Sequence, residues 1–256
     1  GGNPNLKPET GDSLTVGVVW NPEVGDHNFT FIADYWALSL EEGISSLGVQ
    51  FTLNDCYIAG NDAACALITR NADYSINNII DAQLNVSEES AAGIDTEFRW
   101  NYPSEIGDLR ATVLWTHLLE REQVQFAGNP VDDFVGRFNG SAFAEDKANI
   151  TFQWTMGDWS VSYLGEYISG LEGGTGFGFP DANEPDGLYK QQIASQFYSD
   201  IVGSYTYENI VVSAGITNIT DEAPPFIDTG FNGKTDPSTY RMFGQGYYLR
   251  LKWTFE

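Results

Sequence analysis

Apolar and polar side chains alternate with a period of two in many stretches of this chain, and the last stretch shows it most clearly. From Gly246 onwards the odd positions are apolar or aromatic: Tyr247, Leu249, Leu251, Trp253 and Phe255. Most even positions between them are polar, namely Arg250, Lys252 and Thr254. A period of two places each set on one face of a β-strand. A half-buried strand of a soluble protein has this pattern. So has the closing strand of an outer-membrane barrel, where apolar residues face lipid and polar residues face the lumen.

Eight earlier segments alternate in the same way and are predicted to be strands. They cover residues 13–20, 29–40, 84–102, 109–119, 150–156, 159–163, 195–207 and 210–219. With the closing strand, this gives about nine strands. The stretch 43–82 breaks the periodicity, and a short helix is expected near residues 41–47, at its start.

The connections between these strands alternate in length. The short ones are 21–28, 103–108, 157–158 and 208–209, and the long ones are 43–82, 122–145, 172–192 and 220–240. Outer-membrane barrels have short periplasmic turns and long extracellular loops, whereas a soluble sandwich has no reason to sort its loops. Aromatic residues also gather at strand ends beside the short turns, as in an interfacial girdle: Trp20, Trp100, Tyr102, Trp154, Trp159, Tyr205, Tyr207 and Trp253. The pattern therefore predicts an all-β, antiparallel transmembrane barrel.

Composition narrows the possible partners. The chain has 12 Lys and Arg against 36 Asp and Glu, a formal net charge of −24. Phosphate binding requires basic residues on a common face, so nucleic acid is excluded as a partner. The acidic residues could simply keep loops hydrated, or they could form a vestibule that binds cations or divalent-bridged surface lipid. The sequence has no apolar run of about 18 residues, so no transmembrane helix is expected.

The two cysteines, Cys56 and Cys65, lie nine positions apart in a polar stretch. The histidines are His27 and His117, both distant in sequence, so ligands for a metal site are scarce and none is expected. A local disulfide is the preferred interpretation and implies an oxidising compartment. Two free thiols are the alternative.

Three segments resemble one protein family, the TonB-dependent outer-membrane receptors. Residues 3–9, Asn-Pro-Asn-Leu-Lys-Pro-Glu, are similar to a family motif that precedes a strand. Residues 216–221, followed by Pro224 and Pro225, are similar to the Asn-Leu-Phe-Asp segment at the end of the penultimate strand, although the two central positions differ. Residues 235–240 and the closing strand fit the family's C-terminal ending.

This resemblance implies that residues 1–256 are the C-terminal portion of a receptor barrel of about 22 strands. Such a receptor carries an N-terminal plug, lies in the bacterial outer membrane and takes up a scarce ligand with energy from TonB. The implied partners are outer-membrane lipid, the remaining barrel half and plug, TonB, and a small-molecule ligand. The resemblance also implies that the apolar residues of the closing strand form the signal read by the barrel-assembly machine: Tyr247, Leu249, Leu251, Trp253 and Phe255. Nine strands cannot close a plugged barrel, because bare edges in lipid leave backbone groups unpaired. We therefore expect the missing half to be present in the particle.

The ligand-binding candidates are chosen by their odd or even position along a strand, which sets the face of the sheet, or by their position in a long loop. Polar or aromatic side chains expected to face the lumen are Asp34, Trp36, Glu97, Arg99, Glu166 and Asp200. Aromatic residues of the long loop 172–192 are Phe177, Phe179 and Tyr189, beside Asp181 and Asp186. Aromatic rings stack on sugars or on catechols, so they do not separate substrate classes. The alternative is structural: the lumen residues bond one another or the plug, and the loop aromatics pack within the loop.

Active transport of a siderophore–iron complex, an oligosaccharide or a similar ligand is therefore the preferred function. A passive porin-like or structural barrel is the alternative. An outer-membrane enzyme has little support, because the sequence has no Gly-x-Ser-x-Gly elbow and its histidines have no triad-like spacing. The glycine-rich run 173–178 lacks a following Lys, and no EF-hand spacing occurs, so neither a cofactor nor a metal is expected.

Overall fold

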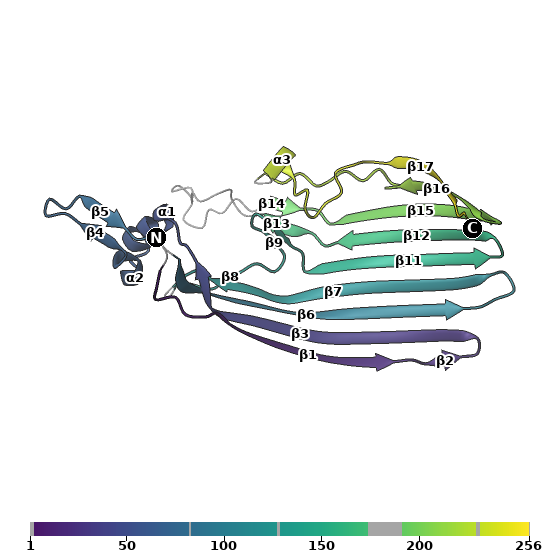
Figure 1. The fold of residues 1–256 in the computed structure, drawn as a ribbon, viewed down its shortest axis with the longest axis horizontal. Coiled ribbons are helices and arrows are strands. Elements are labelled where there is room, and N and C mark those ends of the chain that lie inside the picture. Colours follow the sequence, from purple (N-terminus) through teal and green to yellow (C-terminus); the bar gives the residue numbers. More distant parts are fainter. Residues whose placement is uncertain (1–2, 82, 127–128, 174–190, 229–230, 256) are drawn as a thin grey trace. The chain divides into compact units, whose positions relative to one another are not determined.

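A computed structural model describes residues 3–81, 83–126, 129–173, 191–228 and 231–255. Over this part of the chain, nine long strands form the main sheet, and their order in the sheet follows the sequence (Figure 1). They are β1 Thr10–Trp20, β3 His27–Ser45, β6 Leu84–Tyr102, β7 Asp108–Val124, β11 Asp146–Met156, β12 Trp159–Ile168, β15 Gln196–Tyr207, β16 Ile210–Thr217 and β17 Gly246–Trp253. Two short strands, β2 Glu23–Val24 and β8 Asp132–Asp133, pair at the margins. The nine strands predicted from periodicity are confirmed.

The short turns fix the pairing register. Strands β11 and β12 are joined by Gly157 and Asp158, and Met156 lies opposite Trp159. Strands β15 and β16 are joined by Glu208 and Asn209. Gly157 and Glu208 have φ angles of +56° and +52°, the left-handed conformation on which tight hairpins depend. Both two-residue turns lie where the sequence pattern predicts them.

The helix expected near residues 41–47 is absent there, because β3 continues to Ser45. Hydrogen bonds from neighbouring segments hold this end of the strand. The Ile44 amide donates to Glu9 Oε1 at 2.7 Å, and Asn85 Nδ2 donates to the Glu42 carbonyl at 2.8 Å. Strand pairing thus overrides the helical preference of the glutamates. A helix does form further along, as α1 Val49–Tyr57.

The chain divides into two compact units. The first comprises residues 1–14, 37–92 and 120–133. It contains α1, α2 Asp62–Cys65, and a separate hairpin of β4 Ile68–Arg70 and β5 Ile76–Ile79. Its small core is built on Cys56, Ala64 and Phe126.

The second unit comprises residues 15–36, 93–119 and 134–256. A four-stranded sheet in it consists of β9 Arg137–Phe138, β10 Ala142–Phe143, β13 Leu171–Gly173 and β14 Gln191–Ile193, and a short helix, α3, covers Phe231–Lys234. The larger core lies here and includes Ile168, Leu171, Tyr198, Ile227 and Tyr240. This core packs the connection between β16 and β17 against the strands.

The main sheet leaves much of its apolar surface uncovered. Along β1 the exposed fractions of Val16, Val18 and Trp20 are 61%, 62% and 62%, and Leu249 of β17 is 78% exposed. A water-facing sheet of a soluble domain does not present such a continuous apolar surface. The path of paired strands ends at β1 on one side and β17 on the other, so over the described residues the sheet is open. Among the described helices, none is long and apolar enough to cross a membrane.

Candidate functional site

Two of the predicted lumen residues meet in one depression of about 260 Å³. Asp34 comes from β3 and Glu97 from β6, and Asp95 of β6 and Thr116 of β7 also contribute polar side chains to the lining. We call these four residues the Asp34 pocket. Each lies on the strand face that period-two parity assigns to the polar side. The pocket is therefore a product of the alternation rather than of any local motif.

Two glycines make room for the side chains of β3 that face this side. A Cβ atom at Gly17 would lie 1.7 Å from Asp34 Oδ1, and one at Gly93 would lie 2.5 Å from the Trp36 ring. Asp34 thus lies over the β1 backbone and Trp36 over the β6 backbone. Trp36 Nε1 is buried and has no hydrogen-bond partner among the described residues.

The carboxylates of the Asp34 pocket differ in their hydrogen-bond and ion-pair partners. Glu97 forms an ion pair with Arg99, two positions away on the same strand face. Asp95 accepts a hydrogen bond from Thr116 Oγ1 at 2.6 Å. Asp34 has neither a hydrogen bond nor an ion pair within the part of the chain that the structure describes. Its carboxylate is the one in the pocket that remains available for another group.

The other two lumen candidates, Glu166 and Asp200, meet away from this pocket. Both bind Arg241: Nε donates to Glu166 Oε2 at 2.9 Å, and Nη1 donates to Asp200 Oδ1 at 2.7 Å. The guanidinium also lies over the ring of Tyr198, 5.3 Å from its centroid. We call these four residues the Arg241 clamp. Burial by itself lowers the pKa of Arg241. The hydrogen bonds to Asp200 and Glu166 raise this pKa by more than burial lowers it, so the net shift is upward.

The segment that resembles the family's Asn-Leu-Phe-Asp motif continues this network. The Asn218 amide donates to Asp200 Oδ1 at 2.8 Å, and the Asn218 side chain bonds both the amide and the carbonyl of Glu222, at 2.9 and 2.8 Å. Asp221 Oδ1 accepts from the Gln245 amide at 2.7 Å. Asn218 and Asp221 have φ angles of +50° and +54°, which Asn and Asp tolerate better than other non-glycine residues. The motif thus turns the chain and ties both ends of the last long connection together.

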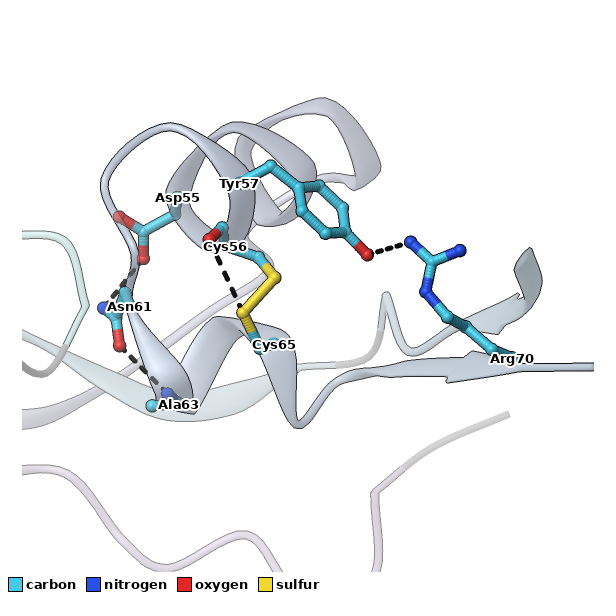
Figure 2. The surroundings of a disulfide bond; sticks show 7 residues. All are labelled: Asp55, Cys56, Tyr57, Asn61, Ala63, Cys65 and Arg70. Carbon is cyan, nitrogen blue, oxygen red and sulfur yellow. Dashed lines mark hydrogen bonds between the residues drawn. A yellow bond between two sulfur atoms is a disulfide. The ribbon is translucent and has the colours of Figure 1, made fainter. Parts of the chain in front are cut away.

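The predicted disulfide is present in the first unit, where Cys56 of α1 is bonded to Cys65 of α2 (Figure 2). Asn61 caps α2, because its Oδ1 accepts from the Ala63 amide at 3.0 Å, and its Nδ2 donates to Asp55 at 2.8 Å. Arg70 reaches from β4 to the Tyr57 hydroxyl, and its Cζ lies 5.4 Å from the centroid of the Tyr57 ring. The disulfide thus joins two helices of a small folded insertion between β3 and β6.

The closing strand pairs with β16, as expected, and Leu249 lies opposite Ala214. Its apolar side chains are all exposed, from 53% at Trp253 to 78% at Leu249. Tyr248, on the other face, covers Gly215 of β16, where a Cβ would lie 2.5 Å from the ring. The strand itself ends at Trp253, and the ring of Phe255 lies 4.5 Å from that of Trp253. The assignment of these residues as an assembly signal stays a prediction.

Aromatic rings cluster at strand ends beside the short turns, as predicted. His27 stacks on Tyr102 with 4.1 Å between ring centroids, and Trp100 Nε1 donates to His27 Nδ1 at 3.0 Å. Beside the turn at Gly157, Trp159 and Tyr205 lie 4.6 Å apart. These side chains join an apolar body to a polar tip, the combination that suits a membrane interface.

Three candidates cannot be placed. Phe177, Phe179 and Tyr189, with Asp181 and Asp186, lie in residues 174–190, outside the described residues. Among the residues that are described, no group of three or more His, Cys, Asp and Glu could hold a metal ion. Sequence reasoning missed Arg241, which follows an irregular loop and carries no periodic signal.

Comparison with known proteins now identifies the class. The model of the family described as TonB dependent receptor-like, beta-barrel, matches residues 1–219, and the chain belongs to this family. It is an outer-membrane β-barrel protein, as predicted. No curated protein matches the sequence.

Solved structures of receptors and transporters share the fold. A mutant of the ferric enterobactin receptor PfeA from Pseudomonas aeruginosa is 16% identical with a TM-score of 0.60, over 99% of this chain and 32% of that one. The siderophore receptor PirA from Acinetobacter baumannii is 20% identical with a TM-score of 0.61, over 99% and 33%. The outer-membrane transporter YddB from Escherichia coli is 13% identical with a TM-score of 0.64, over 99% and 34%. This chain therefore spans about a third of the length of these structures.

Proposed function

We propose that this chain is the C-terminal part of the wall of an active uptake receptor. The receptor takes a scarce small-molecule ligand across the outer membrane with energy from TonB. The observation that carries the proposal is the open, sequential nine-strand sheet in a chain of the TonB-dependent receptor family. An open sheet in lipid leaves backbone groups unpaired at both edges, so β1 and β17 require further strands. The remaining barrel half and the plug supply those strands and the energy coupling.

The two faces of the sheet have different tasks under this proposal. The exposed apolar side chains, such as Val16, Val18 and Leu249, face outer-membrane lipid. The polar side faces the ligand path, and the Asp34 pocket contributes to that wall a carboxylate that has no bonded partner among the described residues. Glu97 and Arg99 neutralise each other, so Asp34 and the neighbouring Trp36 are the residues best placed to contact a passing ligand. Glu166 and Asp200 shape the wall through Arg241 instead.

The related structures suggest which ligand class to assay first. They include PfeA, a ferric enterobactin receptor, and PirA, a siderophore receptor. We take ferric siderophores as the first class to assay and oligosaccharides as the second. We propose transport and no catalytic step for this receptor, as its family indicates.

Uptake in living cells tests the proposal. Cells that express the receptor carrying this chain are assayed with radiolabelled ferric siderophores and with oligosaccharides, in strains with and without TonB. We expect one ligand to accumulate only when both the receptor and TonB are present, while surface binding persists without TonB. Uptake that is unchanged on deleting TonB would instead establish the passive, porin-like barrel.

A further inference from the structure

A cavity of about 120 Å³ lies in the first unit, at the ends of β3, β6 and β7 that carry the long connections. Five polar side chains line it: Ser45, Ser46, Ser87, Gln123 and Gln125. We call these five residues the Ser87 pocket. They belong to three strands that are neighbours in the sheet, or directly follow one of these strands in the chain.

Most polar side chains of the Ser87 pocket have no hydrogen-bond partner. Ser87 is only 6% exposed, yet its hydroxyl makes no hydrogen bond within the part of the chain that the structure describes. The same is true there of the side chains of Ser45, Ser46 and Gln125. Native proteins leave few buried polar groups unsatisfied. A buried hydroxyl that lines a polar cavity therefore indicates a partner from outside the chain.

The position of the Ser87 hydroxyl is fixed by the sheet. A Cβ atom at Gly43 of β3 would lie 2.3 Å from Ser87 Oγ and 3.1 Å from the Ser87 carbonyl oxygen. The side chain thus lies over the β3 backbone, in space that exists because residue 43 is a glycine. The pocket is therefore part of the paired strands and not only of the connection above them.

The lining presents no net charge. Among the described residues that line the pocket, none is charged, and Leu47 and Phe51 supply its apolar part. Gln123 Nε2 donates to Glu89 Oε1 at 3.2 Å, and Glu89 is paired with Arg121 at 2.8 Å, so this carboxylate already has its cation. A charged group that entered the pocket would lose water without gaining a counter-charge. The expected occupant is therefore neutral.

The remaining chemistry is that of a hydroxyl-rich ligand. Serine hydroxyls and glutamine carboxamides can each donate and accept hydrogen bonds. The hydroxyls of a sugar do the same, and its C–H groups can pack against apolar side chains such as Phe51, which is held by the small core of this unit. The volume is many times the roughly 10–15 Å³ that one water requires, but well below the roughly 300 Å³ of a complete small-molecule site. It suits one sugar unit of a larger molecule.

We propose that the Ser87 pocket is a binding subsite for one neutral sugar unit. The inference rests on the proposed function for its position, because that function places the long connections on the outer side of the membrane. Two sources supply sugars there: a free oligosaccharide that the receptor takes up, and the lipopolysaccharide of the surrounding leaflet. The pocket does not suit an anionic ligand from either source.

Binding to the purified, full-length receptor tests the site. The probes are neutral glucan, xylan, mannan, galactan and chitin oligosaccharides, and detergent-dispersed lipopolysaccharide as a separate arm. We expect at least one of them to bind. A free oligosaccharide that binds assigns the sugar unit to the transported ligand, and binding of lipopolysaccharide alone assigns it to the membrane.

Failure of every probe to bind overturns the inference. The proposed function would still stand if a ferric siderophore were taken up with TonB. Conversely, sugar binding by a receptor whose uptake does not depend on TonB would leave this inference intact and overturn the proposed function. The two failures are therefore distinguishable.

Substitutions locate the bound sugar, and both target residues are exposed, so the variants are expected to fold. Ser46→Phe places a ring in the pocket and should lower affinity on the order of tenfold or more. Ser141→Phe, at an exposed serine between β9 and β10, is its control. Gln125→Met removes the hydrogen-bonding groups at similar length and should lower affinity roughly three- to tenfold. Gln50→Met, in α1 and outside the pocket, is the matched control. Unchanged affinity in Ser46→Phe, or equal losses in a variant and its control, overturns the assignment.

Discussion

The Asp34 pocket and the Arg241 clamp both contain Asp and Glu side chains, but these carboxylates differ in their partners. Glu166 and Asp200 each bind the guanidinium of Arg241 at 2.9 and 2.7 Å, and Asn218 adds a further bond to Asp200. Asp34 lies in an open depression without a bonded partner among the described residues. A carboxylate on the polar side of a barrel strand therefore says little by itself. Its partner decides whether it holds the fold or is available to a ligand.

Removing the centre of the clamp should have the largest effect on stability. Arg241→Met leaves two half-buried carboxylates without their cation, which should cost about 2–4 kcal/mol. Unfolding in urea, followed by the gel mobility shift of the folded barrel, measures this loss. Lys234→Met removes the exposed ion pair with Asp228 and should cost less than about 0.5 kcal/mol. Equal losses in the two variants would show that the clamp is not a stability element.

Filling the space under Trp36 should have the next largest effect. A Cβ at Gly93 would meet the Trp36 ring at 2.5 Å and the His117 carbonyl at 2.8 Å, so Gly93→Ala should cost about 1–3 kcal/mol and displace Trp36. The same substitution at Gly203 of β15 is the control, because nothing lies within 4 Å of a Cβ there. Tryptophan fluorescence and the urea midpoint report the two effects. A Gly93→Ala protein that matches Gly203→Ala in both would contradict the packing described here.

A pH dependence tests the burial of Tyr240, which lies in the same buried core as Tyr198 of the clamp. The pKa of Tyr240 is raised from 10 to about 12 by burial, so the folded state holds this proton more tightly than the unfolded state. The resulting stability is complete below pH 10 and is lost as the pH rises from 10 towards 12, about 3 kcal/mol in all. Tyr240→Phe should flatten this part of the profile of urea midpoint against pH. The same slope in wild type and variant would contradict the assignment to Tyr240.

Periodicity predicted the strands because the barrel wall has one apolar and one polar side. The alternation of residue types along each strand therefore shows which side chains face which side. Asp34 and Glu97 were found in this way, although 63 positions separate them in the sequence. The clamp could not be predicted, because Arg241 reaches Glu166 across 75 positions from a connection without a repeat. The end of β3 was also missed, since its glutamates favour a helix locally and only partners in other segments, such as Asn85, keep them in the strand. Long-range contacts of irregular segments leave no trace in a local pattern.

The most direct measurement compares two single substitutions of the same kind in the purified receptor, by ligand affinity and by urea midpoint. Asp34→Asn should lower ligand affinity about tenfold, the effect of losing one charged contact, while the urea midpoint stays unchanged. Asp200→Asn should lower the urea midpoint and leave the affinity of the folded receptor near that of the wild type. Asp158→Asn, in a short turn, should change neither. If Asp34→Asn binds like wild type, or Asp200→Asn loses affinity without losing stability, the division between a ligand-facing pocket and a structural clamp is wrong.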